Sequence, residues 1–565
     1  MNAPILVRRD VPEASVRALV AAGMDPLFAR LYAARGVREP SEASFRLSQL
    51  PPPDLMKGMK AVVDRLVRAI RARERLLIIA DYDADGATAC AVGLRGLRAM
   101  GAEVGYLVPN RFVHGYGLTP EIVALAAEDR PRVLITVDNG IASVEGVEAA
   151  RARGIDVIIT DHHLPGEALP ATPYIVNPNQ PGCAFPSKAM AGVGVMFYVL
   201  LALRAQLRAE GAWPAGGQPD LNALLDLVAL GTVADVVSLD SLNRRLVEAG
   251  LRRIREGRMQ PGVAALFQVA ERRPENATTY DFGFILGPRI NAAGRLEDMS
   301  LGIECLVTDD PARAAEIAER LDQLNQERRA IEADMRDEAD RMIEAEIEPD
   351  QRAIVLMDSR WHQGVIGIVA GRLRERWHRP TLVFAPGEGT ELKGSGRSIP
   401  GFHLRDALDL TAKRHPGLIQ RFGGHAMAAG LSIVNAHFAR FARAFEAVAR
   451  ELVTDAMLER TIESDGSFPV EALDFETARA LHRHVWGQAF PPPLFDDEFT
   501  VLDCRVVAMR HMKMRLKRDG RIFEAIRFGT TEPPPNPMRA AYRVNLSEWQ
   551  GSERVDLVIE QWWEA

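Results

Sequence analysis

Short apolar runs alternate with amphipathic helical stretches through the first half of the chain. Residues 76–80, 133–137 and 155–160 are mostly apolar, and a segment with helical spacing follows each of them. Strands of a parallel sheet have this composition because helices cover both faces of the sheet. The alternation therefore predicts βαβ units and an α/β fold built on a parallel sheet.

Acids and histidines follow these predicted strands. The segments directly after the strands, and after a helical stretch at 221–230, are Asp81-Tyr82-Asp83-Ala84-Asp85-Gly86, Asp138-Asn139-Gly140, Asp161-His162-His163 and Gly231-Thr232-Val233-Ala234-Asp235. Taken alone, the first segment also fits a polar loop that caps a helix. The carboxyl ends of parallel strands meet at one edge of a sheet, however, and α/β folds bind ligands there.

Clustered carboxylates repel one another unless a cation neutralises them. Carboxylate oxygens with imidazole nitrogens, and without thiolates, suit Mn²⁺ or Mg²⁺ better than structural zinc. A lone histidine pair is more often a surface or capping feature than a ligand, but this pair shares its sheet edge with acids from three other segments. The sequence therefore predicts a divalent-metal site at this edge.

The pattern changes three times after residue 306. Residues 312–348 contain neither proline nor glycine and have apolar side chains at helical spacing, which predicts a connecting helix about 55 Å long. An α/β pattern then returns, and short alternating segments with an Asp519-Gly520 turn predict a final all-β domain. The predicted domains are a lead-in at 1–48, an α/β domain with the acids at 49–306, the connecting helix at 307–349, a second α/β domain at 350–456 and the β-domain at 457–565.

Composition narrows the class of protein without identifying a substrate. The chain has 565 residues, 47% of them apolar, which is enough for several domains with cores. Its net charge of −7 argues against a protein that coats DNA, but not against a nuclease whose basic residues line a channel. Four cysteines without CxxC spacing, no signal-peptide pattern and no apolar run of about 18 residues predict a reduced, cytoplasmic setting without a membrane.

Several motifs together resemble the DHH phosphoesterase superfamily. The four acidic segments are similar to its four motifs. Gly287-Pro288-Arg289-Ile290-Asn291, Gly394-Ser395-Gly396-Arg397-Ser398 and Gly423-Gly424-His425 resemble its bacterial members that degrade single-stranded DNA from the 5′ end. The similarity extends from about residue 50 to the C-terminus. It implies a DHH-type parallel-sheet catalytic domain, a long connecting helix, a second α/β domain and a C-terminal OB-fold.

The resemblance also implies a function. The expected protein is a metal-dependent exonuclease that hydrolyses single-stranded DNA 5′ to 3′ to mononucleotides in DNA repair and recombination. It is expected to be a monomer that works with a single-stranded-DNA-binding protein and a helicase. Two alternatives stay open: another phosphodiesterase of the superfamily, such as an oligoribonuclease or a cyclic-dinucleotide phosphodiesterase, and an inactive single-strand-binding factor. The β-domain argues against the first, and the complete set of expected ligands argues against the second.

The same resemblance assigns roles within the predicted metal site. Two divalent ions, Mn²⁺ or Mg²⁺, are expected, one held by Asp81 and Asp83, the other by Asp85, His162 and Asp235, with Asp138 bridging both. Asp138 and His163 are the expected catalytic residues, and His163 is expected to contact the scissile phosphate as a proton donor or charge stabiliser. An alternative makes His163 a partner that orients a metal ligand.

Substrate-binding residues are implied outside the metal site. The candidates are Arg111, Arg289, Asn291, Ser395, Arg397 and His425. Because backbone donors near glycine assist phosphate binding, the arginines are expected to form a pocket for the 5′-terminal phosphate or the first backbone phosphates. On the β-domain, Lys513, Arg515 and Lys517 alternate along one predicted strand. They fit an OB-fold groove for single strands, and they also fit an ordinary solvated face.

Overall fold

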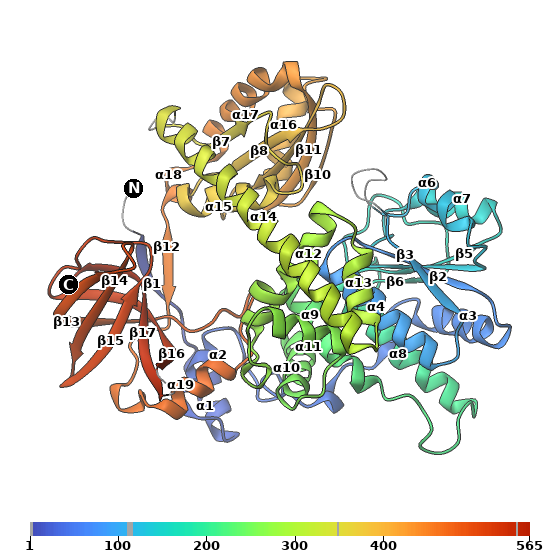
Figure 1. Cartoon of the computed structure of the whole chain (residues 1–565), viewed down its shortest axis with the longest axis horizontal. Coiled ribbons are helices and arrows are strands. Elements are labelled where there is room, and N and C mark those ends of the chain that lie inside the picture. Colours follow the sequence, from blue (N-terminus) through green and yellow to red (C-terminus); the bar gives the residue numbers. More distant parts are fainter. Residues whose placement is uncertain (1–3, 110–116, 347–349, 550–551) are drawn as a thin grey trace. The chain divides into compact units, whose positions relative to one another are not determined.

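The structure, a computed structural model, describes residues 4–109, 117–346, 350–549 and 552–565 (Figure 1). The chain divides into two compact units. The small unit contains Met1–Val7 and Asn325–Glu463, and the large unit contains Arg8–Leu324 and Ser464–Ala565. One helix, α14 (Pro311–Glu346), contributes residues to both units. It lies within residues 307–349, the range predicted for the connecting helix.

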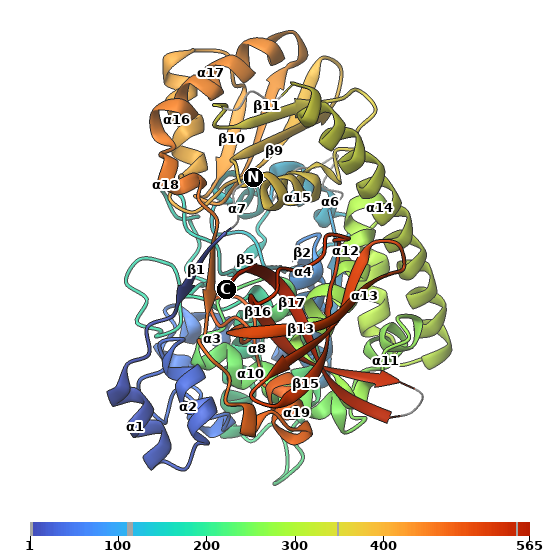
Figure 2. The same cartoon turned by 90° about the vertical axis from the view of Figure 1, so that its left-hand side faces the viewer.

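A five-stranded parallel sheet forms the framework of the first part of the large unit (Figure 1), and its strands β2 and β5 are also labelled in Figure 2. Its strands, in spatial order, are β3 (Val104–Leu107), β2 (Leu76–Ala80), β4 (Val133–Val137), β5 (Asp156–Thr160) and β6 (Ile175–Val176). Ala80 pairs with Val137, and Val137 pairs with Thr160, so these three strands end at the same level. The residues that follow them therefore emerge side by side, which confirms the predicted α/β fold.

Both faces of this sheet are covered by helices. Ile78 of β2 packs into one core with α4 (Ala84–Ala99) and α9 (Leu225–Ala234). Its neighbours Leu77 and Ile79 pack into a second core with α6 (Pro120–Ala127) and α7 (Val144–Ala152). Because successive side chains point to opposite faces, a strand covered on both sides needs apolar residues at every position.

Helix α8 (Gly192–Ala209) is long and rich in apolar residues, although Arg204 and Arg208 interrupt its apolar run. Among the described residues, this is one helix that is long and apolar enough to cross a membrane by length and composition. However, 61% of it is buried inside the protein. Its Leu200 lies so close to α4 that a Cβ atom added to Gly96 would be 2.3 Å from the leucine Cδ1 atom. These contacts are those of a core helix.

The C-terminal part of the large unit is a closed five-stranded barrel. Its strands, in spatial order, are β13 (Phe495–Val507), β14 (His511–Arg518), β15 (Arg521–Arg527), β17 (Ser552–Glu564) and β16 (Met538–Trp549). Met512, Met514 and Leu516 of β14 are buried in the interior, so the alternating residues at 513, 515 and 517 face outward. The predicted all-β C-terminal domain is confirmed.

The segment that leads into the barrel packs on helix α2 (Pro26–Ala33) of the large unit. The Tyr32 hydroxyl and His484 Nδ1 share a hydrogen bond of 3.0 Å, and Arg35 forms a buried ion pair of 2.8 Å with Asp465. Trp486 belongs to the same hydrophobic core as the helices around the sheet. The N-terminal lead-in and the start of the barrel domain thus complete the core of the large unit.

The small unit contains a second α/β fold, as predicted. Its sheet has the order β10 (Arg421–Gly424), β11 (Ala428–Val434), β9 (Glu391–Arg397), β8 (Thr381–Pro386) and β7 (Ile354–Met357). Only the β7–β8 pairing within this sheet is parallel. Helices α16 (Leu404–Arg414) and α17 (Phe438–Leu452) share one core with the sheet, whereas α15 (Ile366–Trp377) and the later part of α14 share another.

Candidate metal centre

The loop between β2 and α4 carries the first three acids of the centre. Asp83 is the N-cap of α4, and its Oδ1 atom accepts hydrogen bonds from the backbone N–H groups of Asp85 and Gly86 at 2.9 and 3.0 Å. The capping interpretation is therefore correct for Asp83, but it does not exclude metal binding, because a carboxylate has a second oxygen. Gly86 is required here, since a Cβ atom would lie 2.6 Å from the carbonyl oxygen of Asp81.

Asp138 occupies the end of β4 with a strained backbone. Its φ angle is +62°, a left-handed conformation that is costly for a residue with a side chain. The backbone N–H of Asp138 donates to the carbonyl of Thr160 at 3.0 Å. On the other side, a Cβ atom on Gly192 of α8 would lie 2.6 Å from the Asp138 Cβ atom. These close contacts hold the carboxylate at the edge of the sheet.

The imidazole of His162 lies between two carboxylates. Its Nε2 atom is 3.1 Å from Asp138 Oδ1 and 3.5 Å from Asp235 Oδ2. His162 Nε2 and Asp235 Oδ2 are buried, and neither makes a hydrogen bond within the described part of the chain. Because a buried polar atom without a hydrogen bond is costly, these two atoms fit ligands of a cation.

All the predicted metal ligands meet in one cluster. Three overlapping groups have ligand atoms within 4.8 Å of one another: Asp81 with Asp83 and Asp138, Asp85 with His162 and Asp235, and Asp138 with His162 and His163. The first two groups coincide with the two ligand sets expected from the sequence. The donor set of carboxylates and neutral imidazole fits Mn²⁺ or Mg²⁺.

Burial and mutual repulsion disfavour the charged form of the central carboxyl groups. Burial, followed by the charges of Asp85 and Asp83, raises the pKa of Asp138 and the pKa of Asp235 well above the ordinary value. Burial and then the charge of Asp83 raise the pKa of Asp85 to about 7. A nearby cation favours the charged form of a carboxyl group, so bound metal ions would reverse this effect.

The two histidines have opposite protonation preferences. Burial and then the charge of His163 lower the pKa of His162 to about 4, so its imidazole is neutral, as a metal ligand must be. Burial acts to lower the pKa of His163. A 2.8 Å hydrogen bond between its Nδ1 atom and Asp161, together with the negative charges of Asp161, Asp81 and Asp83, outweighs burial and raises that pKa. His163 is therefore suited to carry a proton.

Three supporting contacts were not predicted from the sequence. The N–H groups of Gly192 and Val193, at the start of α8, donate to the two carboxylate oxygens of Asp85 at 2.6 and 2.9 Å. Asp161 orients His163, as described above. Asn291 was expected to bind substrate, but its Oδ1 atom accepts the N–H of Ala84 at 2.8 Å and so holds the metal-binding loop. A polar residue far along the chain gives no local indication of such a contact.

Two further candidates for substrate binding, Arg111 and Arg289, lie in the same part of the sequence. Arg111 lies outside the described residues. Arg289 is on α12 (Gly287–Leu296), and its Nη2 atom forms an ion pair of 2.8 Å with Asp322. Its Nη1 atom donates to the carbonyl of Ile285 at 2.7 Å. A DNA phosphate would therefore compete with Asp322 for this guanidinium group.

Ser395, Arg397 and His425 belong to the small unit. Arg397 lies at the end of β9, and burial lowers its pKa. Its Nη1 atom lies 3.3 Å from Ser395 Oγ, and a Cβ atom on Gly367 of α15 would lie 3.0 Å from Ser395 Oγ and 3.2 Å from Arg397 Nη2. His425 is exposed in the turn between β10 and β11. Ser395 and Arg397 thus lie side by side against α15. They lie close to the helix because Gly367 has no side chain at this point.

The outer face of β14 is only partly basic. Lys513 lies 3.3 Å from Glu524, and Arg515 lies 3.2 Å from Asp503. Arg505 pairs with Lys513 across the β13–β14 ladder and adds a positive charge. The role of Lys513, Arg515 and Lys517 in DNA binding stays a prediction.

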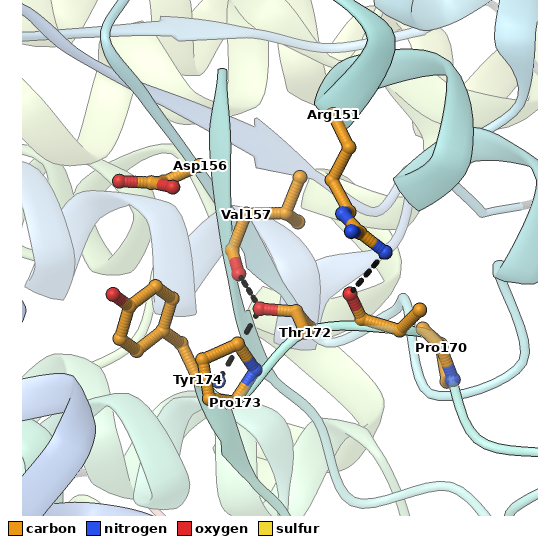
Figure 3. A pocket seen from close by; sticks show the side chains of 8 residues that line it. Arg151, Asp156, Val157, Pro170, Thr172, Pro173 and Tyr174 are labelled. Carbon is orange, nitrogen blue, oxygen red and sulfur yellow. Dashed lines mark hydrogen bonds between the residues drawn. The ribbon is translucent and has the colours of Figure 1, made fainter. Parts of the chain in front are cut away.

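A pocket of about 400 Å³ lies at the opposite edge of the sheet, and it is separate from the metal centre (Figure 3). Asp156, at the start of β5, and Thr172 line it, and Thr172 Oγ1 donates to the carbonyl of Val157 at 2.7 Å. Arg151 reaches the pocket from α7. None of the predicted ligands lines this pocket.

The parallel sheet with acids and histidines at its carboxyl edge defines a metal-dependent phosphoesterase of the DHH class. Residues 75–232 match the model of the DHH family N-terminal domain, residues 350–452 match the DHHA1 domain, and residues 464–561 match the RecJ OB domain. These three domains occur here in the order expected from the sequence.

Full-length relatives make the assignment more specific. The chain is 48% identical to the single-stranded-DNA-specific exonuclease RecJ of Dickeya dadantii over 552 residues, which is 95% of this chain and 96% of that protein. It is 44% identical to the corresponding protein of Escherichia coli, with 99% of each chain covered. A crystal structure of RecJ with Mn²⁺ from Thermus thermophilus matches with a TM-score of 0.84 and 29% identity, covering 100% of this chain and 80% of that one. The chain belongs to the RecJ family.

Proposed function

We propose that this chain is a single-stranded-DNA-specific exonuclease that hydrolyses its substrate 5′ to 3′ and releases mononucleotides in DNA repair and recombination. The observation that supports this function is the cluster of five aspartates and His162 at the carboxyl edge of the sheet. The full set of family domains around the cluster favours this enzyme over the shorter phosphodiesterases of the superfamily.

The cluster is proposed to hold two divalent ions, Mn²⁺ or Mg²⁺. We assign Asp81 and Asp83 to one ion, Asp85, His162 and Asp235 to the other, and Asp138 to both. Bound ions supply a nucleophilic water and stabilise the charge that develops during in-line phosphodiester hydrolysis. The contribution of the chain is rigidity, since Thr160 fixes the backbone of Asp138 and the N-terminus of α8 fixes Asp85.

His163 is proposed to act on the scissile phosphate. The hydrogen bond between its Nδ1 atom and Asp161 fixes the orientation of the ring beside the metal cluster. Because its pKa is raised, His163 retains a proton that it can donate, or share in a hydrogen bond, as negative charge develops. The alternative role, orienting a metal ligand, predicts a different mutational result and is addressed in the Discussion.

DNA phosphates are proposed to bind the other predicted residues. In the small unit these are Ser395, Arg397 and His425; in the large unit they are Arg289 and Asn291, together with Arg111. The partly buried guanidinium group of Arg397 supports this assignment, because a buried cation is stable only with an anion or good hydrogen bonds.

The proposed cellular setting is the cytoplasm. All four cysteines are free, which fits a reducing compartment. We further propose a monomer that acts with a single-stranded-DNA-binding protein and a helicase, because an enzyme limited to unpaired strands benefits from proteins that remove duplex structure. Size measurement with and without these proteins tests this part.

The direction of degradation tests the proposed function. With Mn²⁺ or Mg²⁺, a 5′-label on single-stranded DNA should appear at once as mononucleotide, whereas a 3′-labelled strand should shorten progressively. EDTA should stop both reactions. Arg289→Ala and Arg397→Ala should raise KM, since each removes a phosphate-binding cation. Arg153→Ala is a matched control, because Arg153 is an exposed arginine near the opposite edge of the sheet. Release of the 3′-label first would refute the proposed polarity.

The outer face of β14 is expected to contribute to binding of long strands. A Lys513→Ala/Arg515→Ala/Lys517→Ala variant should bind them more weakly, with a salt dependence flatter by a slope of roughly 0.7 per lost phosphate contact. Substitution is the right test because truncation before the barrel would uncover the core around Trp486. Titration at several salt concentrations measures the slope. Affinity and slope equal to those of the unmodified chain would show that this face is merely solvated.

A further inference from the structure

Two aromatic rings are exposed together on a segment that packs on α9, the helix that ends at the metal ligand Asp235. Tyr280 is 55% exposed and Phe284 is 63% exposed. Their ring centroids lie 5.0 Å apart and their planes meet at 24°, so they form a stacked pair. We call Tyr280 and Phe284 the aromatic pair. Buried aromatic residues fill cores, but more than half of each side chain in this pair is exposed and can contact a ligand.

The backbone below the aromatic pair is unusual. Phe284 lies in a π-helical turn, η5 (Asp281–Leu286), which continues directly into α12. Such turns are rare and often occur at functional sites. The Asp281 side chain beside Tyr280 is occupied, because it accepts hydrogen bonds from Arg272 at 2.8 Å and from Thr278. Its negative charge is therefore compensated and does not repel a phosphate backbone.

The aromatic pair is connected to the metal centre on one side. The helical segment that carries it packs on α9, whose C-cap is the ligand Asp235. A Cβ atom on Gly283 would lie 3.6 Å from Val233, and one on Gly287 would lie 3.1 Å from Ala234. Val236, directly after Asp235, is 62% exposed and has a φ angle of +62°, which is unusual for a β-branched residue. The aromatic pair and the exposed Val236 thus belong to two segments that pack against each other, one of which ends at a metal ligand.

On its other side, the same segment contacts the barrel domain. Thr279, which precedes Tyr280, donates its hydroxyl to the carbonyl of Trp486 at 2.6 Å. Trp486 lies in the segment that leads into β13, the first strand of the barrel. The aromatic pair therefore lies on the part of the large unit that joins the metal centre to the barrel.

We propose that the aromatic pair is a stacking platform for the bases of the single strand as it runs to the metal centre. This inference rests on the proposed function. Bases of an unpaired strand expose flat π-faces, and aromatic side chains bind them by stacking without regard to sequence. The rings of a duplex are already stacked and paired, so the platform also favours single strands. Tyr280 and Phe284 are positioning residues, since they do not belong to the metal cluster.

The test compares a Tyr280→Ala/Phe284→Ala variant with the unmodified chain in the full-length protein. Binding is measured in EDTA on an intact single strand and on strands with one abasic site moved stepwise from the 5′ end. For the unmodified chain, an abasic site at the position of the platform should weaken binding about tenfold. The variant should bind the intact strand about tenfold more weakly and should lose this position-dependent effect.

Two further variants separate stacking from general apolar contact. Tyr280→Phe/Phe284→Tyr keeps both rings and should restore binding, whereas Tyr280→Leu/Phe284→Leu keeps apolar surface and should not. Leu125→Ala, which trims an exposed side chain on α6, is the control for surface effects. The melting temperature of each variant checks folding, which should be intact because the two side chains are exposed.

The result that would overturn the proposal is an abasic-site profile of the Ala/Ala variant identical to that of the unmodified chain. Restoration of binding by the Leu/Leu variant would overturn it as well, because leucine cannot stack as an aromatic ring does. Degradation of the intact strand by the unmodified chain is measured in parallel with Mn²⁺. If that activity is absent, the proposed function fails; if it is present and the profiles coincide, only the platform fails.

Discussion

Asp138→Ala is expected to abolish DNA cleavage while single-strand binding stays largely intact. Asp138 forms one ligand group with Asp81 and Asp83, and its Oδ1 atom lies 3.1 Å from Nε2 of His162, which is assigned to the other ion, so its loss is expected to affect both proposed ions. Metal ions provide several kcal/mol of transition-state stabilisation, and about 1.4 kcal/mol corresponds to tenfold in rate, so the expected loss is about 1,000-fold. Hydrolysis and binding are measured on the same preparation.

A matched control uses an aspartate of the same sheet. Asp156 lies at the other end of β5, where it forms an ion pair with Arg65 at 2.6 Å. Asp156→Ala should keep its cleavage rate even if it lowers stability. Cleavage by Asp138→Ala within tenfold of the unmodified rate would contradict the assignment of Asp138 as a shared ligand.

His163→Ala is expected to lose far more turnover than bound metal, whereas His162→Ala should lose both. A proton donor contributes about 10²–10⁴-fold to a rate. His162 has a neutral imidazole between Asp138 and Asp235, as a ligand requires, but the raised pKa of His163 favours a protonated ring. Metal content after dialysis and single-turnover rates distinguish the two variants. Equal metal loss in both would make His163 a ligand or the support of one.

The pH dependence gives an independent test of the same role. If protonated His163 is required, the rate should fall as the pH rises through its pKa. The Asp161 hydrogen bond raises that pKa, so Asp161→Asn should shift the fall to lower pH. An unchanged alkaline limb in Asp161→Asn would show that the proton of His163 does not take part in the rate-limiting step.

Local sequence patterns were sufficient to predict that acids and histidines gather at one edge of a parallel sheet, whereas their division into two sets of metal ligands came from the family resemblance. Every position of β2 is apolar because both sheet faces are covered, and this pattern is visible in the sequence without any partner strand. Acids directly after such strands must lie at the carboxyl edge. The barrel strand with Met512, Met514 and Leu516 inside was predictable for a similar reason. Apolar and polar residues alternate along it, and this alternation indicates a strand with one buried face.

Other features depended on segments far apart in the chain. The hydrogen bond from Ala84 to Asn291 joins residues more than 200 positions apart, so no local pattern predicts that Asn291 supports the metal loop. The ion pair between Arg289 and Asp322 of α14 likewise depends on how two separate helices pack. The apolar helix α8 is a core helix because other helices, α4 and α9 among them, pack against it.

The sequence by itself determined which strands form, which residues follow them and which chemical groups the centre contains. Backbone conformation and side-chain alternation are local properties, so they can be inferred from neighbouring residues. Only the tertiary structure decided that Gly192 approaches Asp138 closely, that the start of α8 binds Asp85, and that Tyr280 and Phe284 remain exposed. Close approach and exposure depend on how distant segments pack, and no local pattern specifies that packing.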